Sequence, residues 1–288
     1  MINKAIILAG GTGTRLKPIT LTTNKQLLPI YDKPLIYYPL SSLMLAGIRN
    51  ILIIVNKGLV QNFKKILSDG SHLGIKISYK EQSKPTGIPD AFTIGKKFIK
   101  SDNIALILGD NFFFGTGFTG LLEKAKSMES GCYIFLKDVK NQKNYGVAVI
   151  KNKKVFKIIE KPKKFISDKA ITGLYFFDNK VIKYSHNLRP SIRNEKEIVD
   201  IINIYKKNKK LNYLDMGRGS LWSDVGKIED FYNVSNYVAL VEKIQGNKIA
   251  CLEEIALNKG WISKKDVERR IKFLGSNPYS DYLKKVIY

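Results

Sequence analysis

Glycines and two cations follow the first apolar run of the chain. The run Ala5–Leu8 leads into the loop Gly10–Arg15, which consists mostly of small residues and ends in a cation, and Lys25 follows after a polar stretch. Loops with little side-chain bulk after a buried strand let backbone N–H groups surround phosphate oxygens. An arginine and a lysine nearby would supply the positive charge that such a site needs. These residues therefore predict a phosphate-handling site.

The glycine loop fits neither of two familiar phosphate-binding patterns. A dinucleotide-binding G-x-G-x-x-G that starts at Gly11 would need glycine at the position of Leu16. A P-loop would need Gly-Lys followed by Ser or Thr, and Thr14-Arg15 stands there instead. The glycines could also serve the backbone alone, because glycine is the usual residue where φ is positive. The two cations favour the phosphate site over that alternative.

Two carboxylates stand where a metal ion could be bound. Asp110 comes directly after Gly109 and the apolar run Ile104–Leu108, and Asp224 ends a strand-like segment before Gly226. Each aspartate alone could equally cap a helix or stabilise a loop. Mg²⁺ is usually held by one or two carboxylates together with substrate phosphates. The pair therefore predicts metal-assisted phosphoryl or nucleotidyl transfer.

Two further segments could contact a ligand or serve the fold alone. Glu160-Lys161-Pro162 ends a β-type segment, where an exposed Glu–Lys pair would contribute little to stability. The functional alternative is hydroxyl recognition by Glu160 and phosphate contact by Lys161. Tyr145-Gly146 could begin a strand or let a ligand approach the backbone. The residues alone do not choose between these alternatives.

The formal net charge of +24 is unusual, and lysines cluster at 151–154, 161–164 and 206–210. Such clusters could form a nucleic-acid-binding surface. They lie between apolar-patterned segments, however, and lack the interleaved aromatic residues of single-strand RNA-binding modules. We therefore expect a solvated surface and no nucleic-acid partner.

The composition of the 288 residues is that of an ordinary globular protein. No apolar run approaches the roughly 20 residues of a membrane span, and the run Ile6–Ala9 is too short for a signal-peptide core. Cys132 and Cys251 are too far apart in sequence to suggest a disulfide framework. We expect a cytoplasmic protein without a membrane partner.

Apolar strands alternate with helical patterns in the first part of the chain. Strands are predicted at Ala5–Leu8, Ile51–Val55, Ile75–Tyr79 and Ile104–Leu108, and helices at Lys33–Ala46, around Leu59–Leu67 and near Asp90–Phe98. Unbroken apolar strands between helices indicate a parallel sheet that is covered on both faces. Ligands bind at the carboxyl ends of such strands, so the glycine loop, Gln82–Pro89 and Asp110 would lie at one edge.

From Cys132 onward the predicted strands become denser. They are expected at Cys132–Leu136, Gly146–Ile150, Val155–Glu160, Gly173–Phe177 and Leu211–Met216, and helices at Val181–Asn187, Glu195–Tyr205, Phe231–Ile244, Leu252–Asn258 and Lys264–Phe273. The predicted fold is α/β, with a Rossmann-like mixed but mainly parallel sheet flanked by helices. The core would span residues 1–226, divided at about residue 130 into the first part and a β-rich part, and residues 227–288 would form a small helical appendage.

The segments Leu8–Leu16 and Lys25–Pro29 resemble the signature of sugar-1-phosphate nucleotidylyltransferases. More narrowly, the chain resembles the short bacterial glucose-1-phosphate thymidylyltransferases. The resemblance covers essentially the whole chain and is carried by Tyr31–Leu40, Leu108–Asn111, Tyr145–Val147, Glu160–Pro162, Thr172–Phe176, Met216–Gly219 and Cys251–Ala256.

This resemblance implies Mg²⁺-dependent transfer of a thymidylyl group from dTTP to α-D-glucose 1-phosphate, which gives dTDP-glucose and pyrophosphate. A sugar-phosphate oxygen would attack the α-phosphorus of dTTP. The product would serve deoxysugar synthesis of the dTDP-rhamnose type and cell-surface polysaccharides. The resemblance also implies a homotetramer with a second, regulatory nucleotide site near subunit contacts, in which residues 227–288 would take part.

The resemblance also assigns roles to individual residues. Catalytic cations would be Arg15, Lys25 and Lys161, and Mg²⁺ would be held by Asp110 and Asp224. The nucleotide-binding part, about 1–130, would use Gly10, Gly11, Gly13, Gln26, Gln82 and Gly87. The sugar-binding part, about 131–226, would use Tyr145, Gly146, Glu160, Lys161, Ile171, Tyr175 and Arg193.

The segment after Gln82 departs from the family pattern. Where the family has Pro-Asp-Gly-Leu-Ala-Gln-Ala, this chain has Pro85–Ala91, in which Pro89 removes an N–H and Asp90 places an anion where an amide is usual. Two alternatives stay open at this point: the same chemistry with UTP, and a catalytically silent nucleotide-binding paralogue. The retained cations and aspartates favour an active enzyme.

Overall fold

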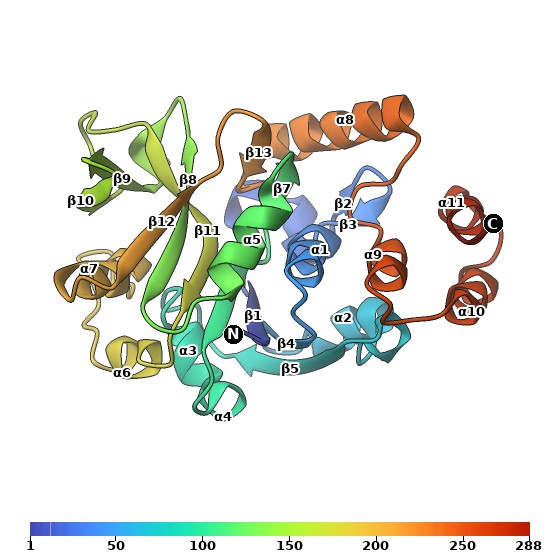
Figure 1. Cartoon of the computed structure of the whole chain (residues 1–288), viewed down its shortest axis with the longest axis horizontal. Coiled ribbons are helices and arrows are strands. Elements are labelled where there is room, and N and C mark those ends of the chain that lie inside the picture. Colours follow the sequence, from blue (N-terminus) through green and yellow to red (C-terminus); the bar gives the residue numbers. More distant parts are fainter. Residues whose placement is uncertain (12) are drawn as a thin grey trace.

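A computed structural model describes residues 1–11 and 13–288. Nine of its strands form one sheet, in which β10–β9–β11–β6–β1–β4–β5 lie side by side and β8 and β12 continue from β11 (Figure 1). These strands are β1 (Lys4–Ala9), β4 (Asn50–Asn56), β5 (Lys76–Gln82), β6 (Ile104–Leu108), β8 (Cys132–Asp138), β9 (Gly146–Lys151), β10 (Lys154–Glu160), β11 (Lys169–Phe177) and β12 (Leu211–Asp215).

The centre of the sheet is parallel, because β1 pairs in parallel with β4 and β6, and β4 with β5. Successive side chains of a strand point to opposite faces, and β1 contributes Ile7 to one buried core and Ile6 to the other. The first core contains side chains of α1 (Tyr37–Leu45), α2 (Val60–Leu67), α5 (Phe118–Lys126) and α9 (Leu252–Asn258). The second contains side chains of α3 (Asp90–Ile94), α4 (Lys96–Ile99), α6 (Val181–His186) and α7 (Ile198–Lys207). The predicted mainly parallel sheet with both faces covered is therefore confirmed.

Strand β11 joins the β-rich part to the parallel centre. Its end, Leu174–Phe177, runs antiparallel to β6, and the same strand pairs with β8 and β9. The register against β8 shifts between Ile171 and Tyr175. Both parts of the core thus share one continuous sheet.

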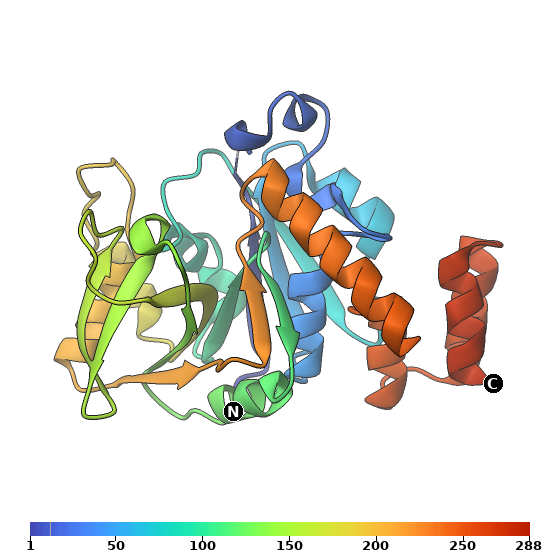
Figure 2. The ribbon, with the colours of Figure 1, turned by 90° about the horizontal axis from the view of Figure 1, so that it is seen from above.

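The C-terminal segment is helical, as predicted. It contains α8 (Ile228–Gln245), α9, α10 (Lys264–Leu274) and α11 (Pro278–Ile287). Helix α8 packs beside the small sheet of β7 (Phe112–Gly115) and β13 (Ser220–Ser223), and α10 and α11 lie at the opposite end of the molecule from β9 and β10 (Figures 1 and 2). The sequence patterns missed β2 (Pro29–Ile30), β3 (Lys33–Pro34), β7, α5 and α11.

Four predicted helices were wrong in their limits, one of them being α8, which begins at Ile228 rather than Phe231. Residues Lys33–Pro34 form β3, paired with β2 (Pro29–Ile30), so α1 begins only at Tyr37. The helix expected near Asp90–Phe98 is instead two short helices, which are separated by a turn at Gly95. Helix α7 begins at Ile198, because Glu197 is extended.

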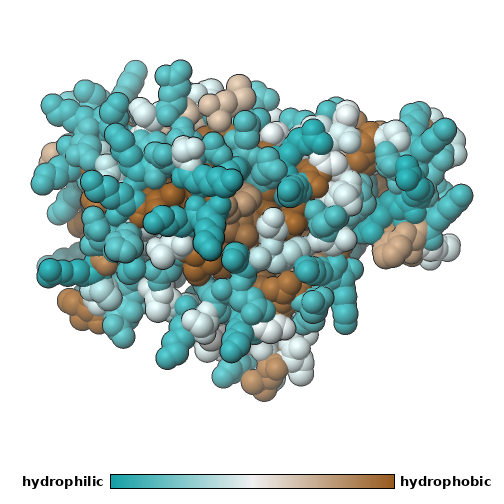
Figure 3. Space-filling view, turned by 90° about the horizontal axis from the view of Figure 1, so that it is seen from below, coloured by the Kyte–Doolittle hydropathy of each residue, from teal (hydrophilic) through white to brown (hydrophobic). Residues whose placement is uncertain are grey.

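Most lysines of the three clusters are exposed. Figure 3 shows a face of the molecule on which hydrophilic side chains predominate and hydrophobic ones occupy small areas. None of the helices that the structure describes is long and apolar enough to cross a membrane.

Candidate active site

The loops after β1 and β5 project from the same edge of the sheet (top of Figure 2). This edge is formed by the carboxyl ends of β1, β4, β5 and β6, because these strands are parallel. Glycines 10, 11 and 13, Gln82 and Asp110 follow or end these strands. The expected clustering of these residues at one edge is thus confirmed.

The glycine loop is held by side chains from two neighbouring strands. Asn56, at the end of β4, accepts a hydrogen bond from the Gly11 N–H at 3.2 Å and donates to the Gly11 carbonyl at 2.9 Å. Gln82 donates to the Asn56 side-chain oxygen at 3.1 Å. A Cβ atom on Gly10 would lie 1.8 Å from Nε2 of Gln82. Any side chain at position 10 would therefore displace the Gln82 amide from its present place.

A small hollow of about 220 Å³ lies beside this loop. Its lining includes Gly11, Lys25 and Asn56. Gly13 has a φ of 57°, in the left-handed region. Gln26 is buried, and its side-chain oxygen has no hydrogen-bond partner among the described residues. The hollow is thus bordered by the glycine loop and by a lysine, which suits an anionic ligand.

Lys25 connects the glycine-loop side of the site to the end of β6. Its Nζ donates to Oδ2 of Asp110 at 2.7 Å, and its side chain is only 8% exposed. The other oxygen of Asp110 accepts from the side chain of Asn111 at 2.9 Å. Asp110 therefore has both oxygens engaged and a cation beside it.

Asn111 lies at the junction of three strands. Its side-chain oxygen accepts from the Gly173 N–H at 3.0 Å and from the indole N–H of Trp222 at 2.6 Å. The residue is 1% exposed. The buried Asn111 amide accepts hydrogen bonds from β11 and β13 and donates one to Asp110. It therefore fixes the Asp110 carboxylate relative to both strands.

Asp224 lies within electrostatic reach of Asp110. Burial raises the pKa of Asp224, and the negative charge of Asp110 raises it further. Tyr145 donates to Oδ1 of Asp224 at 3.0 Å, while burial and the Asp224 charge raise the pKa of the Tyr145 hydroxyl. The two carboxylates therefore repel one another, and a positive ion between them would relieve this repulsion.

The two carboxylates suit a hard cation. Among the residues that the structure describes, no group of three or more His, Cys, Asp and Glu side chains gathers to hold a metal. An ion at Asp110 and Asp224 would therefore need oxygen ligands from elsewhere, such as phosphates or water. This donor set fits Mg²⁺, which commonly takes one or two carboxylates and substrate phosphates.

A pocket of about 180 Å³ opens on the β-rich side of Asp224. Tyr145, whose ring packs against Trp222 with centroids 5.0 Å apart, stands beside Asp224 in its wall. The other predicted sugar-contacting residues that line it are Gly146, Glu160, Lys161, Ile171 and Tyr175. The structure thus brings together all of the predicted sugar-side residues except Arg193.

Arg193 lies next to this group but is bound to carboxylates. Its guanidinium donates to Glu197 at 2.6 and 3.1 Å and to Glu160 at 3.2 Å. Burial raises the pKa of Glu160, and the charge of Glu197 adds to this effect.

Lys161 adopts a positive φ of 42°, a conformation that is uncommon for a residue with a side chain. Its backbone N–H donates to the Tyr145 carbonyl at 2.9 Å.

Arg15 reaches the site from the glycine-loop side. It follows Gly13 in the short 3₁₀ turn Thr14–Leu16 and is exposed. Its guanidinium lies against Gly226, where a Cβ atom would come within 2.9 Å of Nη2. The arginine therefore approaches the segment that carries Asp224.

The segment 82–90 also contacts the β-rich part. Gly87 has a φ of 122°, and a Cβ there would lie 2.1 Å from the carbonyl oxygen of Lys196. The Asp90 carboxylate, which stands where the family pattern has an amide, pairs with Nζ of Lys196 at 2.9 Å. The negative charge in this loop is therefore neutralised within the protein.

Four residues around the site were not predicted: Asn56, Asn111, Trp222 and Lys196. Asn56 and Asn111 follow apolar runs as Asp110 does, so their positions at strand ends could have marked them. Lys196 lies near the start of the predicted helix Glu195–Tyr205, and no sequence feature pointed to Asp90 as its partner.

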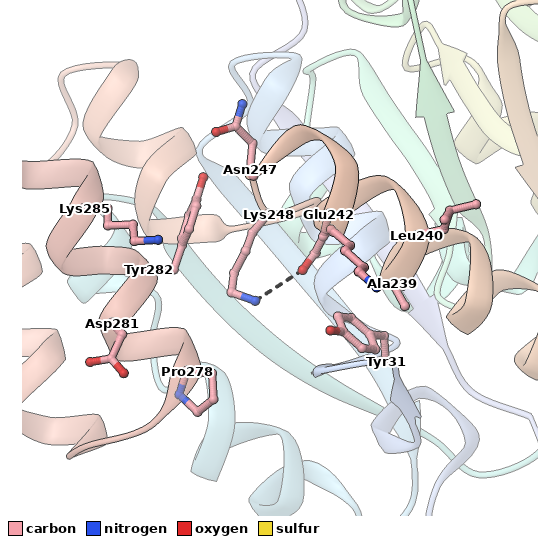
Figure 4. Close-up of a pocket in the computed structure, with 12 residues that line it drawn as sticks. Tyr31, Ala239, Leu240, Glu242, Asn247, Lys248, Pro278, Asp281, Tyr282 and Lys285 are labelled. Carbon is pink, nitrogen blue, oxygen red and sulfur yellow. Dashed lines mark hydrogen bonds and ion pairs between the residues drawn. The ribbon is translucent and has the colours of Figure 1, made fainter.

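A second hollow lies far from this edge, between α8 and α11 (Figure 4). It has a volume of about 660 Å³ and is lined by Tyr31, Glu242, Lys248, Tyr282 and residues around them. Lys248 and the buried Lys33 both pair with Glu242, at 3.2 and 2.9 Å. This ion cluster attaches α8 to the segment before α1.

Comparison with known proteins identifies the family. Residues 4–240 match the nucleotidyl transferase family. The glucose-1-phosphate thymidylyltransferase of Neisseria meningitidis is 46% identical over 99% of both chains, and that of Xanthomonas campestris is 44% identical over 97% of this chain and 95% of its own.

Solved structures agree with this assignment. A Bacillus anthracis protein assigned as a glucose-1-phosphate thymidylyltransferase, crystallised with sucrose, is 38% identical with a TM-score of 0.76, over 81% of this chain and 94% of its own. UDP-glucose pyrophosphorylase in complex with UDP-glucose shares the fold, with a TM-score of 0.72 at 24% identity, over 84% of this chain and 100% of its own. The chain therefore belongs to the nucleotidyl transferase family, among its glucose-1-phosphate thymidylyltransferases.

Proposed function

We propose that this enzyme transfers a thymidylyl group from dTTP to α-D-glucose 1-phosphate, giving dTDP-glucose and pyrophosphate, and that it does so in the cleft described above. The observation that carries this proposal is the position of Asp224, which lines the sugar-side pocket, accepts a hydrogen bond from Tyr145 there, and is close enough to Asp110 to be affected by its charge. Two anionic substrates would meet at these carboxylates, with dTTP on the glycine-loop side and the sugar phosphate on the Tyr145 side.

The chemistry depends on positioning and on charge. A phosphate oxygen of glucose 1-phosphate attacks the α-phosphorus of dTTP, and the bond to the pyrophosphate leaving group breaks. Lys25 and Arg15 would compensate the charge that develops on the triphosphate, and Lys161 would compensate that of the sugar phosphate. Holding both substrates in line supplies much of the rate enhancement.

Roles on the nucleotide side follow the same division. Gly10, Gly11 and Gly13 would allow the backbone to approach the phosphates, while Gln26, Gln82 and Gly87 would contact the nucleoside. Asp110 and Asp224 would hold Mg²⁺, which when bound withdraws charge from phosphate oxygens. The buried Lys25 would place a positive charge beside Asp110.

Roles on the sugar side rest on the pocket of about 180 Å³ beside Asp224. Glu160 and Tyr175 are polar groups beside the apolar Ile171, a combination that suits a sugar ring with hydroxyls on its edge. Gly146 lets the start of β9 lie close to α7, since a Cβ on Gly146 would come within 2.8 Å of the Val199 side chain. Arg193 would exchange its carboxylate partners for the sugar phosphate.

Further features of the protein are proposed on the same basis. The nucleotide-binding part would span about 1–130, the sugar-binding part about 131–226, and residues 227–288 would form a tail used in oligomer contacts. A homotetramer is supported by α8, on which Ile228, Tyr232, Leu240 and Ile244 are between 51% and 74% exposed. Sedimentation analysis would test the tetramer.

The product would feed deoxysugar and polysaccharide synthesis, and the enzyme would act in the cytoplasm.

Pyrophosphate release tests the function. Glucose 1-phosphate is supplied with dTTP, UTP, CTP and ATP in parallel reactions. We expect turnover to be greatest with dTTP. A strong preference for UTP would contradict the thymidylyl assignment but keep the mechanism, and no turnover with any nucleotide would favour a silent paralogue. Salt-sensitive oligonucleotide binding would instead support a nucleic-acid role.

A further inference from the structure

The loop after β5 and the segment before α7 contact one another through their backbones. The Thr86 carbonyl accepts from the Lys196 N–H at 2.9 Å. Gly87 packs so tightly on the same residue that a Cβ would lie 2.1 Å from the Lys196 oxygen and 2.8 Å from its nitrogen. The two segments are more than 100 residues apart in sequence, so this contact is set by the tertiary fold.

An ion pair reinforces the contact. Nζ of Lys196 lies 2.9 Å from Oδ1 of Asp90, and the two side chains are 22% and 18% exposed. The other oxygen of Asp90 accepts a hydrogen bond from Thr86 in its own loop. Asp90 is thus bound to both segments at once. Partial burial weakens the screening of such a pair by water and salt.

The two segments form different walls of the cleft. Gln82 and Gly87 belong to the nucleotide side, whereas Arg193 lies on the sugar side and is fixed through Glu197, which also accepts from Ser191 at 2.7 Å. Ile88 from the first segment lines the sugar-side pocket together with Ile198 and Val199, which follow the second. Residues of both segments therefore lie in the lining of one pocket.

We infer that Asp90 and Lys196 are positioning residues that couple the two substrate sites. Neither lines the sugar-side pocket or the hollow beside the glycine loop. Their ion pair fixes the nucleotide loop against the sugar-phosphate segment, so that binding of one substrate orders the wall that receives the other. Ordering that the first ligand has already caused is not repeated when the second binds, which makes binding cooperative. This inference rests on the proposed function, because it takes dTTP and glucose 1-phosphate as the two ligands.

The test measures this coupling directly. Calorimetry gives the affinity for glucose 1-phosphate with and without the unreactive analogue α,β-methylene-dTTP, and the ratio of the two affinities is the coupling factor. In the unaltered enzyme we expect the analogue to raise the affinity for glucose 1-phosphate. Asp90→Asn and Lys196→Met should each lower the coupling factor by about five- to tenfold, within the usual range for coupled sites. The affinity for the analogue alone and the melting temperature should change little.

Three controls separate coupling from general damage. Lys84→Met removes an exposed lysine from the same loop and should leave the coupling factor unchanged. Lys196→Arg keeps the charge and should retain most of the coupling. In the double variant the two losses should not add, because both substitutions break one contact.

The outcomes distinguish this inference from the proposed function. If the enzyme turns over dTTP and glucose 1-phosphate but the coupling factor is one, or is the same in the variants, the inference is wrong while the function stands. If Lys84→Met lowers the coupling factor as much as Lys196→Met does, the ion pair has no special role. Absence of turnover in the unaltered enzyme would remove the proposed function and this inference with it.

Discussion

Nζ of Lys25 donates to Oδ2 of Asp110 at 2.7 Å, and this contact joins the segment after the glycine loop to the carboxyl end of β6. The lysine side chain is 8% exposed and the aspartate side chain 28%. A pair so placed has two effects, because it stabilises the fold and also puts a cation beside the carboxylate that is proposed to hold Mg²⁺.

Replacing Lys25 by Met should therefore reduce activity more than stability. We expect kcat to fall about 100-fold or more, the usual effect of removing one group that stabilises transition-state charge. The stability loss should be about 1–2 kcal/mol, less than for a fully buried pair, because Asp110 is partly solvated. Steady-state kinetics and urea denaturation measure the two quantities. Lys76→Met, at an exposed position of β5, is the control, and equal kcat values in the two variants would contradict the role of Lys25.

Gly10→Ala should displace Gln82. The new Cβ would overlap the Gln82 amide, whose hydrogen bond to Asn56 would be lost. Because Gln82 is proposed to contact the nucleoside, its displacement should lower the affinity for dTTP about tenfold, which corresponds to about 1.4 kcal/mol of binding free energy. The matched control is Gly120→Ala in α5, where nothing lies within 4 Å of the added Cβ and stability should rise by up to about 1 kcal/mol. Unchanged dTTP affinity in Gly10→Ala would show that Gln82 has no part in nucleotide binding.

Asp224→Asn should stabilise the ligand-free protein while reducing its activity. Because the folded state raises the pKa of Asp224, the ionised carboxylate costs stability above that pKa, and the cost is absent below the unfolded value of about 3.9. The stability of the unaltered protein should therefore fall relative to Asp224→Asn as the pH rises from about 4 towards 7. The amide still offers an oxygen to Tyr145. Activity should fall about 10²- to 10³-fold.

Thermal denaturation at several pH values, without divalent cations, measures this effect. Asp281→Asn, at an aspartate whose side chain is 59% exposed, should show no comparable pH-dependent gain. If Asp224→Asn melts below the unaltered protein at pH 7, the hydrogen bonds of the carboxylate outweigh its repulsion from Asp110.

The parallel centre of the fold followed from local patterns. Runs such as Ile104–Leu108 are apolar throughout because both faces of the sheet are covered, and that property is visible in sequence. The grouping of the glycine loop, Gln82 and Asp110 then followed from strand direction alone. Assigning Tyr145 and Glu160 to a sugar needed the family resemblance, since each residue type has commoner structural uses.

Contacts between distant segments could not be predicted. Asn111 is read in sequence as a polar residue after a strand, but its partners Gly173 and Trp222 come from strands far along the chain. The pairing of Asp90 with Lys196 depends likewise on how α7 packs against the sheet. Strand β7 escaped prediction because its four residues show no alternation, and because its partner β13 lies about 100 residues later in the chain.

Lys33→Met should weaken the attachment of α8. Lys33 is 2% exposed and pairs with Glu242 at 2.9 Å. The substitution therefore leaves a buried carboxylate that has, among the residues that the structure describes, only Lys248 and the Ile249 N–H as partners. We expect a loss of about 3 kcal/mol, at the lower end for a broken buried pair. Chemical denaturation measures it, and Lys243→Met on the exposed side of α8 is the control. A loss below about 1 kcal/mol would mean that Lys248 alone satisfies Glu242.

The C-terminal helices have a small core of their own. Its buried members are Cys251, Val267, Tyr282, Leu283 and Ile287, whereas the sheet lies between two far larger cores. Little apolar surface would have to be exposed for α10 and α11 to open while the sheet stays folded. Their amide hydrogens should accordingly exchange with deuterated solvent much sooner than those of β1 and β6. The end of the chain would therefore behave as a local unfolding unit, and its protection from exchange would report contact with another subunit in the proposed oligomer.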